Sequence, residues 1–324
     1  MERRYLDFER PIEKIEQEIE RLIEIQKTRR VDNQLKITQL QQLLKEKIRE
    51  IYSGLDAFQK VQVARHPQRP HTLDYIGGLL DDFYELHGDR VYGDDPAIIA
   101  GIGKFRGKSI AVIGHQKGST TEENISRNFG MAHPEGYKKA LRVMKIAERF
   151  AFPVLTLIDT PGAHPHLIAE ERNQALAIAQ NLEEMSLLQT PIIAVIIGEG
   201  GSGGALGIGI GDRILMLEFA IYSVISPEGC ASILWKNQKA VAEAANALKL
   251  TSSNLLEFKL IDEVVQEPLG GAHTQPKEMI NILAEAIERN LQMVSKIPLD
   301  ELLETRYRKF RSMGVFEVKE EAET

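Results

Sequence analysis

A run of apolar residues that passes directly into glycines constrains the fold of this chain more than any other feature. Residues 192–197 read IIAVII, long enough for one buried strand, and five glycines follow at once: Gly198, Gly200, Gly201, Gly203 and Gly204. Glycine lacks a β-carbon, so backbone N–H groups in such a segment can approach a negatively charged atom closely. The segment therefore predicts a strand that ends in a ligand-facing turn and the start of a helix.

Three known patterns fit these glycines. Residues 198–203 match the G-x-G-x-x-G dinucleotide fingerprint, and Glu218 follows at the spacing of the acid that binds ribose. Residues 200–204 match the G-x-S-x-G turn of hydrolases, in which Ser202 would be the nucleophile. The third interpretation is an oxyanion hole formed by glycine N–H groups at a helix N-terminus. A tight turn without a function would match the first two patterns equally well.

The residues that follow favour the oxyanion hole. A dinucleotide site needs a full crossover helix, but only residues 203–211 lie before the next apolar run. A hydrolase needs an acid and a histidine after Ser202, and the candidates are Asp212, Asp262 and His273. His273 is the only downstream histidine, and it lies in a glycine-rich loop that is a poor setting for a general base.

A second loop is expected beside the first. The strand predicted at residues 154–159 continues into the sequence TPGA at residues 160–163. Ligands of parallel α/β sheets bind at the carboxyl ends of strands, so the two loops would line one crevice if their strands are neighbours. Neither loop offers an evident nucleophile, metal-ligand cluster or paired acid and base. The crevice is therefore predicted to stabilise an anion with backbone amides.

Composition narrows the class of function. The net charge of -7 argues against nucleic acid as the main partner. The single cysteine, Cys230, excludes an intrachain disulfide and a multi-cysteine zinc site, and we predict no metal site. The start, MERRYLDFER, lacks the apolar core of a signal peptide, and Glu199 interrupts the one membrane-like run. We therefore expect a cytoplasmic protein that does not enter a membrane.

The chain divides into a helical extension and a main domain. Apolar residues spaced three and four apart predict two amphipathic helices between residues 11 and 51, arranged as a hairpin. We assign residues 1–70 to this extension and residues 71–324 to the main domain with its C-terminal helices. The basic, proline-containing segment 65–70 is typical of a linker, and a rigid turn facing an anionic ligand is the alternative.

Strands and helices alternate in the main domain, which indicates an α/β fold with mostly parallel strands. One helix is expected to end near residue 150 and another to span residues 168–188, and a basic patch is expected at residues 306–311. The predicted strands cover residues 98–105, 109–114, 154–159, 192–198, 213–217 and 221–225.

Ten stretches, in order over nearly the whole chain, resemble one family. They are LDFERPI (6–12), ARHPQRPHTLDYI (64–76), GHQKG (114–118), RNFGM (127–131), PEGYKKALR (134–142), AERF (147–150), IDTPGA (158–163), GEGGSGGAL (198–206), YSVISPEGCASILWK (222–236) and EPLGGAH (267–273). The chain closely resembles the α subunits of the carboxyltransferase of bacterial acetyl-coenzyme A carboxylase, a family of the crotonase-like superfamily. The resemblance implies an α/β, crotonase-like spiral of ββα units with an N-terminal helical extension. The family domain is expected to start near residue 35.

The resemblance also implies a reaction and its partners. In this family the carboxyl group of carboxybiotin, held on a separate biotin carboxyl carrier protein, moves to acetyl-coenzyme A. The product is malonyl-coenzyme A for fatty acid biosynthesis. A β subunit with a zinc ribbon completes the enzyme in an expected α2β2 core, and a biotin carboxylase subunit consumes the ATP. This chain would be active only with its β subunit.

The family motif implies roles for particular residues. The second glycine pair, Gly203 and Gly204, would form the backbone oxyanion hole for biotin. Substrate-binding roles are implied for ten further residues: Thr160, Pro161, Gly162, Ala163, Gly200, Gly201, Ser226, Pro227, Glu228 and Gly229.

The sequence departs from the family pattern beside the 160–163 loop. The family has an aromatic residue where this chain has His164, and glycines where it has His166 and Asn173. Histidine in place of glycine adds bulk and disfavours positive φ, so we expect a different pocket wall. We rank this above a metal role, because two histidines without a third ligand are weak evidence. The alternatives are a scaffold subunit that assembles without activity and a Ser202-dependent hydrolase.

Overall fold

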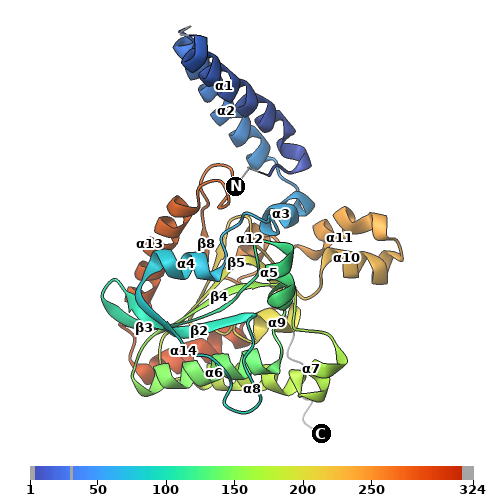
Figure 1. Ribbon diagram of the computed structural model, residues 1–324. Coiled ribbons are helices and arrows are strands. Elements are labelled where there is room, and N and C mark those ends of the chain that lie inside the picture. The colour runs from blue at the N-terminus through green and yellow to red at the C-terminus, as the bar shows by residue number, and fades with distance from the viewer. Residues whose placement is uncertain (1–3, 30–31, 316–324) are drawn as a thin grey trace.

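The computed structural model describes residues 4–29 and 32–315 (Figure 1). Two long helices, α1 (Arg10–Arg29) and α2 (Gln34–Ser53), form a hairpin that projects from the rest of the molecule. The two helices predicted between residues 11 and 51 are therefore confirmed. The domain boundary at residue 70 stays a prediction.

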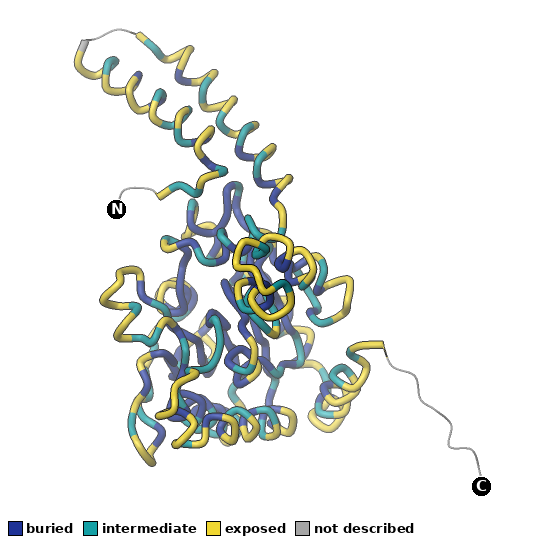
Figure 2. The backbone as a smooth tube through the Cα atoms, turned by 90° about the vertical axis from the view of Figure 1, so that its right-hand side faces the viewer, coloured by how far each residue is buried: buried dark blue, intermediate teal, exposed yellow. Residues whose placement is uncertain are grey.

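Apolar side chains hold the two helices of the hairpin together. Ile19 and Leu22, which belong to the predicted apolar stripe, are buried against Ile37 of the second helix. Figure 2 shows that much of the remaining hairpin is exposed, in contrast to the buried strands of the main body. The hairpin is thus stabilised by a narrow seam, whereas the main body has a large core.

The main body is built on one mixed sheet with the strand order β1-β2-β3-β4-β5-β6-β8, and β7 pairs with β5. Pairing is antiparallel from β1 to β3 and parallel from β3 onward. The predicted mostly parallel α/β architecture is confirmed. The strands are β1 (Leu80–Glu85), β2 (Ile98–Phe105), β3 (Lys108–His115), β4 (Val154–Thr160), β5 (Ile192–Gly201), β6 (Arg213–Leu217), β7 (Ile221–Ser223) and β8 (Glu263–Val265).

Helices cover the sheet above and below in the view of Figure 1. In that view α4 (Thr72–Leu79) and α13 (Pro276–Val294) lie above, and they contact each other. Below lie α6 (Pro134–Arg149) and α8 (Gln174–Leu187), with α14 (Leu299–Arg311) packed against α8. This cover explains why β4 and β5 are buried at every position and are rich in apolar residues.

The remaining α-helices are short. They are α3 (Ala57–Ala64), α5 (Thr121–Ser126), α7 (Leu167–Glu171), α9 (Ser202–Leu206), α10 (Pro227–Cys230), α11 (Val241–Leu248) and α12 (Ser252–Glu257).

The structure corrects several predicted elements. The helix expected at residues 168–188 is broken into α7 and α8 by Asn173, whose φ is 65°. Asparagine tolerates this left-handed conformation, which explains how it can stand where the family has glycine. The strands β1 and β8 were not predicted, because β1 carries polar residues at exposed positions and β8 is only three residues long.

The segment 65–70 is not a solvated linker, and this prediction was wrong. The Arg69 side chain is 1% exposed, donates from Nε to the Ile197 carbonyl, and forms an ion pair with Glu267. The basic patch predicted at residues 306–311 is not exposed throughout, because the Arg306 side chain is 1% exposed and pairs with Asp212. Both arginines carry buried charges that depend on partners distant in sequence.

Candidate active site

Two glycine-containing loops meet at the carboxyl ends of neighbouring strands. Strands β4 and β5 pair in parallel, with Thr160 opposite Gly200, so the predicted adjacency of the two loops is confirmed. A β-carbon on Gly201 would lie 2.1 Å from the Pro161 carbonyl oxygen. The loops therefore touch backbone to backbone, which only glycine permits at this distance. Thr160 stabilises its own turn by donating from Oγ1 to the Gly162 carbonyl at 2.7 Å.

The short helix α9 begins at the end of the glycine segment. Its first N–H groups lack partners within the helix, as at any helix N-terminus, and are available to an acceptor. Ser202, the first residue, has a φ of 47°, in the left-handed region. A cavity of about 350 Å³ opens beside this turn, and its mostly apolar lining includes Ser202, Gly203, Leu206, Tyr222, Val224 and Phe310. The geometry brings Gly203 to an apolar cavity large enough for a small ring system.

The remaining predicted substrate-binding residues, at positions 226–229, lie near the same end of the sheet. Strand β7 pairs with the end of β5, placing Ser223 opposite Gly201. Ser226 then caps α10 by accepting from the Gly229 N–H at 3.1 Å. The residues of loop 226–229 therefore follow a strand that is paired with the glycine segment. The structure thus brings the three sets of predicted residues to the same end of the sheet.

A row of charged side chains links these loops, and Glu228 is the only one of them that the sequence analysis proposed as a site residue. Lys117 Nζ lies 2.8 Å from Asp159 Oδ1 and 3.3 Å from Glu199 Oε2. Arg65 pairs with Glu199 at 2.6 Å and with Glu228 at 2.7 Å. For Arg65 and Lys117 the only sequence signal was their place in the motifs at residues 64–76 and 114–118, because nothing in the spacing of these charged residues indicated contact.

Electrostatics keeps the central members of this row charged. Burial alone would raise the pKa of Asp159, but the charge of Lys117 and a hydrogen bond from His71 lower it well below its ordinary value. Burial would likewise lower the pKa of Lys117, and the neighbouring carboxylates Asp159 and Glu199 raise it above its ordinary value. Both side chains are therefore ionised near neutral pH.

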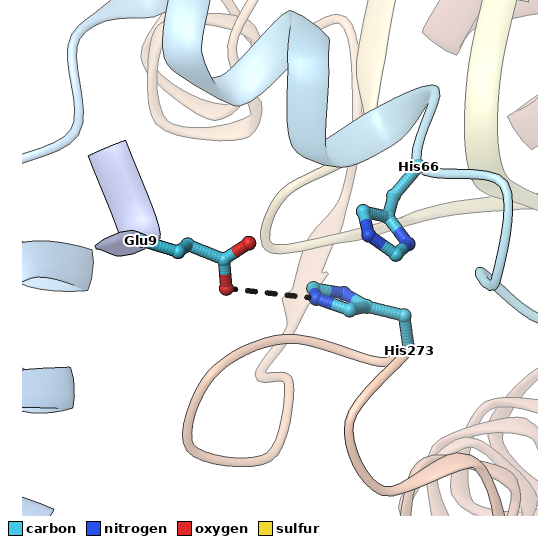
Figure 3. A group of neighbouring side chains, drawn as sticks. All are labelled: Glu9, His66 and His273. Carbon is cyan, nitrogen blue, oxygen red and sulfur yellow. Dashed lines mark ion pairs between the residues drawn. The ribbon is translucent and has the colours of Figure 1, made fainter. Parts of the chain in front are cut away.

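The groups that a hydrolase would need have other partners. His273 stacks on His66 with ring centroids 4.0 Å apart, and its Nε2 lies 3.9 Å from Glu9 Oε1 (Figure 3). Asp212 pairs with Arg306, and Asp262 pairs with Lys309. These contacts give no support to a catalytic triad on Ser202.

Glu9, His66 and His273 are the one group of the described residues with metal-ligand atoms close together, within 4.8 Å. The ring stacking in Figure 3 opposes metal binding, because two imidazoles on one ion with bonds of about 2.1 Å would hold their centroids roughly 5 Å apart. His66 also uses both nitrogens, accepting from the Gln68 N–H and contacting the Arg4 carbonyl. Burial, with repulsion from His273, lowers the pKa of His66 to about 4. The group is a packed cluster between the N-terminal segment and the main body.

The two unusual histidines lie beside the 160–163 loop. His164 stacks on His133 with ring centroids 3.9 Å apart, and His166 lies 5.0 Å from His164. His164 therefore fills an aromatic position by stacking as an aromatic residue would.

Among the described residues, no helix has the length and apolar character needed to cross a membrane.

Solved structures of other proteins share the fold of this chain. The chain is similar to transcarboxylase 12S solved with methylmalonyl-coenzyme A and methylmalonic acid bound, with a TM-score of 0.56 and 18% identity, over 69% of this chain and 42% of that one. It is also similar to a chain of the Pseudomonas malonate decarboxylase hetero-tetramer solved with coenzyme A, with a TM-score of 0.59 and 14% identity, over 74% and 94% respectively. The predicted crotonase-like α/β fold is confirmed.

Sequence similarity identifies the particular family among proteins with this fold. Residues 5–314 match the family described as acetyl co-enzyme A carboxylase carboxyltransferase-like. The acetyl-coenzyme A carboxylase carboxyl transferase subunit alpha of Methylococcus capsulatus is 52% identical over 321 residues, covering 98% of this chain and 99% of that protein. The chain belongs to the acetyl-coenzyme A carboxylase carboxyltransferase family.

Proposed function

We propose that this chain is the α subunit of an acetyl-coenzyme A carboxylase carboxyltransferase. With a β subunit it transfers the carboxyl group of carboxybiotin to acetyl-coenzyme A and forms malonyl-coenzyme A for fatty acid biosynthesis. The observation that carries this proposal is membership of the family over residues 5–314, together with the close contact between the two glycine-containing loops. The chain thus contributes one side of an active site.

Gly203 and Gly204 are the proposed oxyanion hole. When bound, carboxybiotin supplies the carboxyl group to be transferred. The N–H groups of the two glycines would donate to its ureido oxygen, where negative charge develops as the carboxyl group leaves. The apolar cavity beside Gly203 would accept the thioether ring of biotin, which is fused to the polar ureido ring. No side chain of α9 is required as a base in this scheme.

The surrounding loops contain the proposed substrate-binding residues. Thr160, Pro161, Gly162 and Ala163 would form one wall of the crevice, and Gly200 and Gly201 would form its floor. Ser226, Pro227, Glu228 and Gly229 would close a third side. The backbone contact between the first two loops supports this arrangement, because it fixes the amides before a ligand arrives.

Partner subunits complete the proposed enzyme. We expect a cytoplasmic α2β2 core with zinc-ribbon β subunits, served by a biotin carboxyl carrier protein and by a biotin carboxylase that uses ATP. Exposed apolar side chains beside the cavity support a covering partner: Leu206 is 42% exposed and Val224 is 77% exposed.

The reverse reaction tests this function. The chain is combined with a carboxyltransferase β subunit, and the carboxyl group of malonyl-coenzyme A is transferred to a free biotin derivative, releasing acetyl-coenzyme A. Activity that requires both subunits is the expected result. Assembly without activity would overturn the proposal in favour of a scaffold subunit. No observation favours that alternative or the Ser202 hydrolase.

A further inference from the structure

We infer that Lys117 is a positioning residue, whose ammonium group ties together the two strand ends that carry the oxyanion-hole loops. The inference rests on the proposed function. It concerns a residue that lies outside the two glycine-containing loops and sets the geometry of those loops. Lys117 follows β3, whereas its two partners lie on β4 and β5. One side chain therefore connects three neighbouring strands at their carboxyl ends.

The contacts of Lys117 are buried and short. Its side chain is 15% exposed, and those of Asp159 and Glu199 are 3% and 7% exposed. Asp159 also accepts the backbone N–H of Glu199 at 3.0 Å through Oδ1, the oxygen that contacts Lys117. The ammonium group, a carboxylate and a backbone amide thus form one compact junction between β4 and β5.

The junction lies directly next to both loops. Asp159 precedes Thr160, the first residue of the 160–163 loop, and Glu199 precedes Gly200. Beyond the junction, the two loops are in contact through Gly201 and Pro161. A displacement of either strand end would therefore reach the amides of Gly203 and Gly204 within a few residues.

Two glycines make room for this junction. A β-carbon on Gly198 would lie 2.5 Å from Asp159 Oδ1. Gly130 has a φ of +77°, and a β-carbon there would lie 3.0 Å from Lys117 Cγ and 2.9 Å from the Asp159 carbonyl oxygen. The lack of a side chain at these two positions thus leaves space for Lys117 and Asp159. An ion pair on the surface would not need such space.

Removing the ammonium group would leave two buried carboxylates facing each other. Asp159 and Glu199 both lie within 3.3 Å of the same nitrogen, so their charges would repel at short range without it. Arg65 contacts Glu199 through Oε1, whereas Lys117 contacts Oε2 and also reaches Asp159, so it is Lys117 that bridges the two carboxylates. The strand ends would separate, and the loops with them.

Kinetics of the assembled enzyme test this role. In Lys117→Met we expect kcat for carboxyl transfer to fall about 100-fold, the usual cost of a misplaced reactive geometry, with KM changed much less. Lys117→Arg keeps the charge and should restore at least about a tenth of the wild-type kcat. Lys104→Met is the matched control, because Lys104 pairs with Asp82 on the surface and should leave kcat unchanged.

The outcomes separate this inference from the proposed function. An inactive wild-type assembly would overturn the function itself. An active wild type together with a folded, assembled Lys117→Met of wild-type kcat would overturn only the positioning role, as would failure of Lys117→Arg to recover activity. If Lys117→Met does not assemble, Glu199→Gln decides, because it keeps the side-chain shape and removes one charge of the junction. A normal kcat in Glu199→Gln would overturn the inference, and a lowered kcat with unchanged KM would support it.

Discussion

Gly204 packs against Gly162 so closely that a β-carbon on Gly204 would lie 2.4 Å from the Gly162 carbonyl carbon. The neighbouring glycine differs, because a β-carbon on Gly203 would meet only Ile178 Cδ1, at 3.6 Å. The two members of the proposed oxyanion hole therefore have different reasons to be glycine. Gly204 is required by the contact between loops, whereas Gly203 borders open space that a ligand would occupy.

This difference predicts unequal effects of the smallest substitution. Gly204→Ala should force the two loops apart and lower kcat by about 100-fold or more, comparable to loss of an oxyanion donor. Gly203→Ala should assemble normally and act mainly by narrowing the cavity, which raises KM for the biotin derivative. Steady-state kinetics of both variants with β subunit check this. Wild-type turnover in a folded, assembled Gly204→Ala would contradict the assignment.

Ser202 is expected to be dispensable. Its acid and histidine candidates are engaged in other contacts, so none of them is in place to activate its hydroxyl. Ser202→Ala should keep kcat within a factor of about 3, since no transition-state contact is lost. A large loss of rate, together with labelling of the wild type by a serine-reactive phosphonate, would restore the hydrolase interpretation.

Arg306 is predicted to contribute to stability rather than to catalysis. It is 1% exposed, forms an ion pair with Asp212 at 2.8 Å, and donates to the carbonyls of Met185, Leu188 and Thr190. Arg306→Met would leave Asp212 as an unpaired buried charge, which costs about 3–5 kcal/mol of unfolding free energy. Urea unfolding measures this.

Arg308 provides the matched control for that measurement. It lies on the same helix but is 76% exposed and pairs with Glu304 on the surface. Arg308→Met should change the free energy of unfolding by less than about 0.5 kcal/mol. Equal losses in the two variants would show that burial of the Arg306 pair is not the cause.

His164 is expected to make stability sensitive to acid. Burial, with the charges of His133, His166 and Arg172, lowers its pKa from the ordinary 6.5 to about 4. Between these two values the unfolded chain binds more protons than the folded chain, so stability falls as the pH falls through this window. His164→Phe removes that contribution and keeps an aromatic ring. Its free energy of unfolding should fall less than that of the wild type between about pH 7 and about pH 4.5. Parallel losses in the two proteins would contradict this.

Much of the fold was predictable because it depends on local pattern. Apolar spacing indicated the helices of the hairpin, and segments rich in apolar residues indicated β4 and β5, which are buried throughout. The prediction failed where the signal was weak or depended on packing. The polar strand β1 and the three-residue strand β8 lack a run of apolar residues. The helix break at Asn173 depends on the left-handed backbone conformation of that one residue.

The sequence by itself determined the family, the alternation of strands and helices, and the glycine segment on which the proposed site depends. Only the tertiary structure determined which charged side chains form buried ion pairs that support the fold. Arg69 and Glu267 are 198 residues apart, and Lys117 is 82 residues from Glu199, yet each pair is in contact. The sequence pattern around a buried arginine or lysine resembles that of an exposed one. Its partner, and therefore its role, is set by the folding of distant segments against each other.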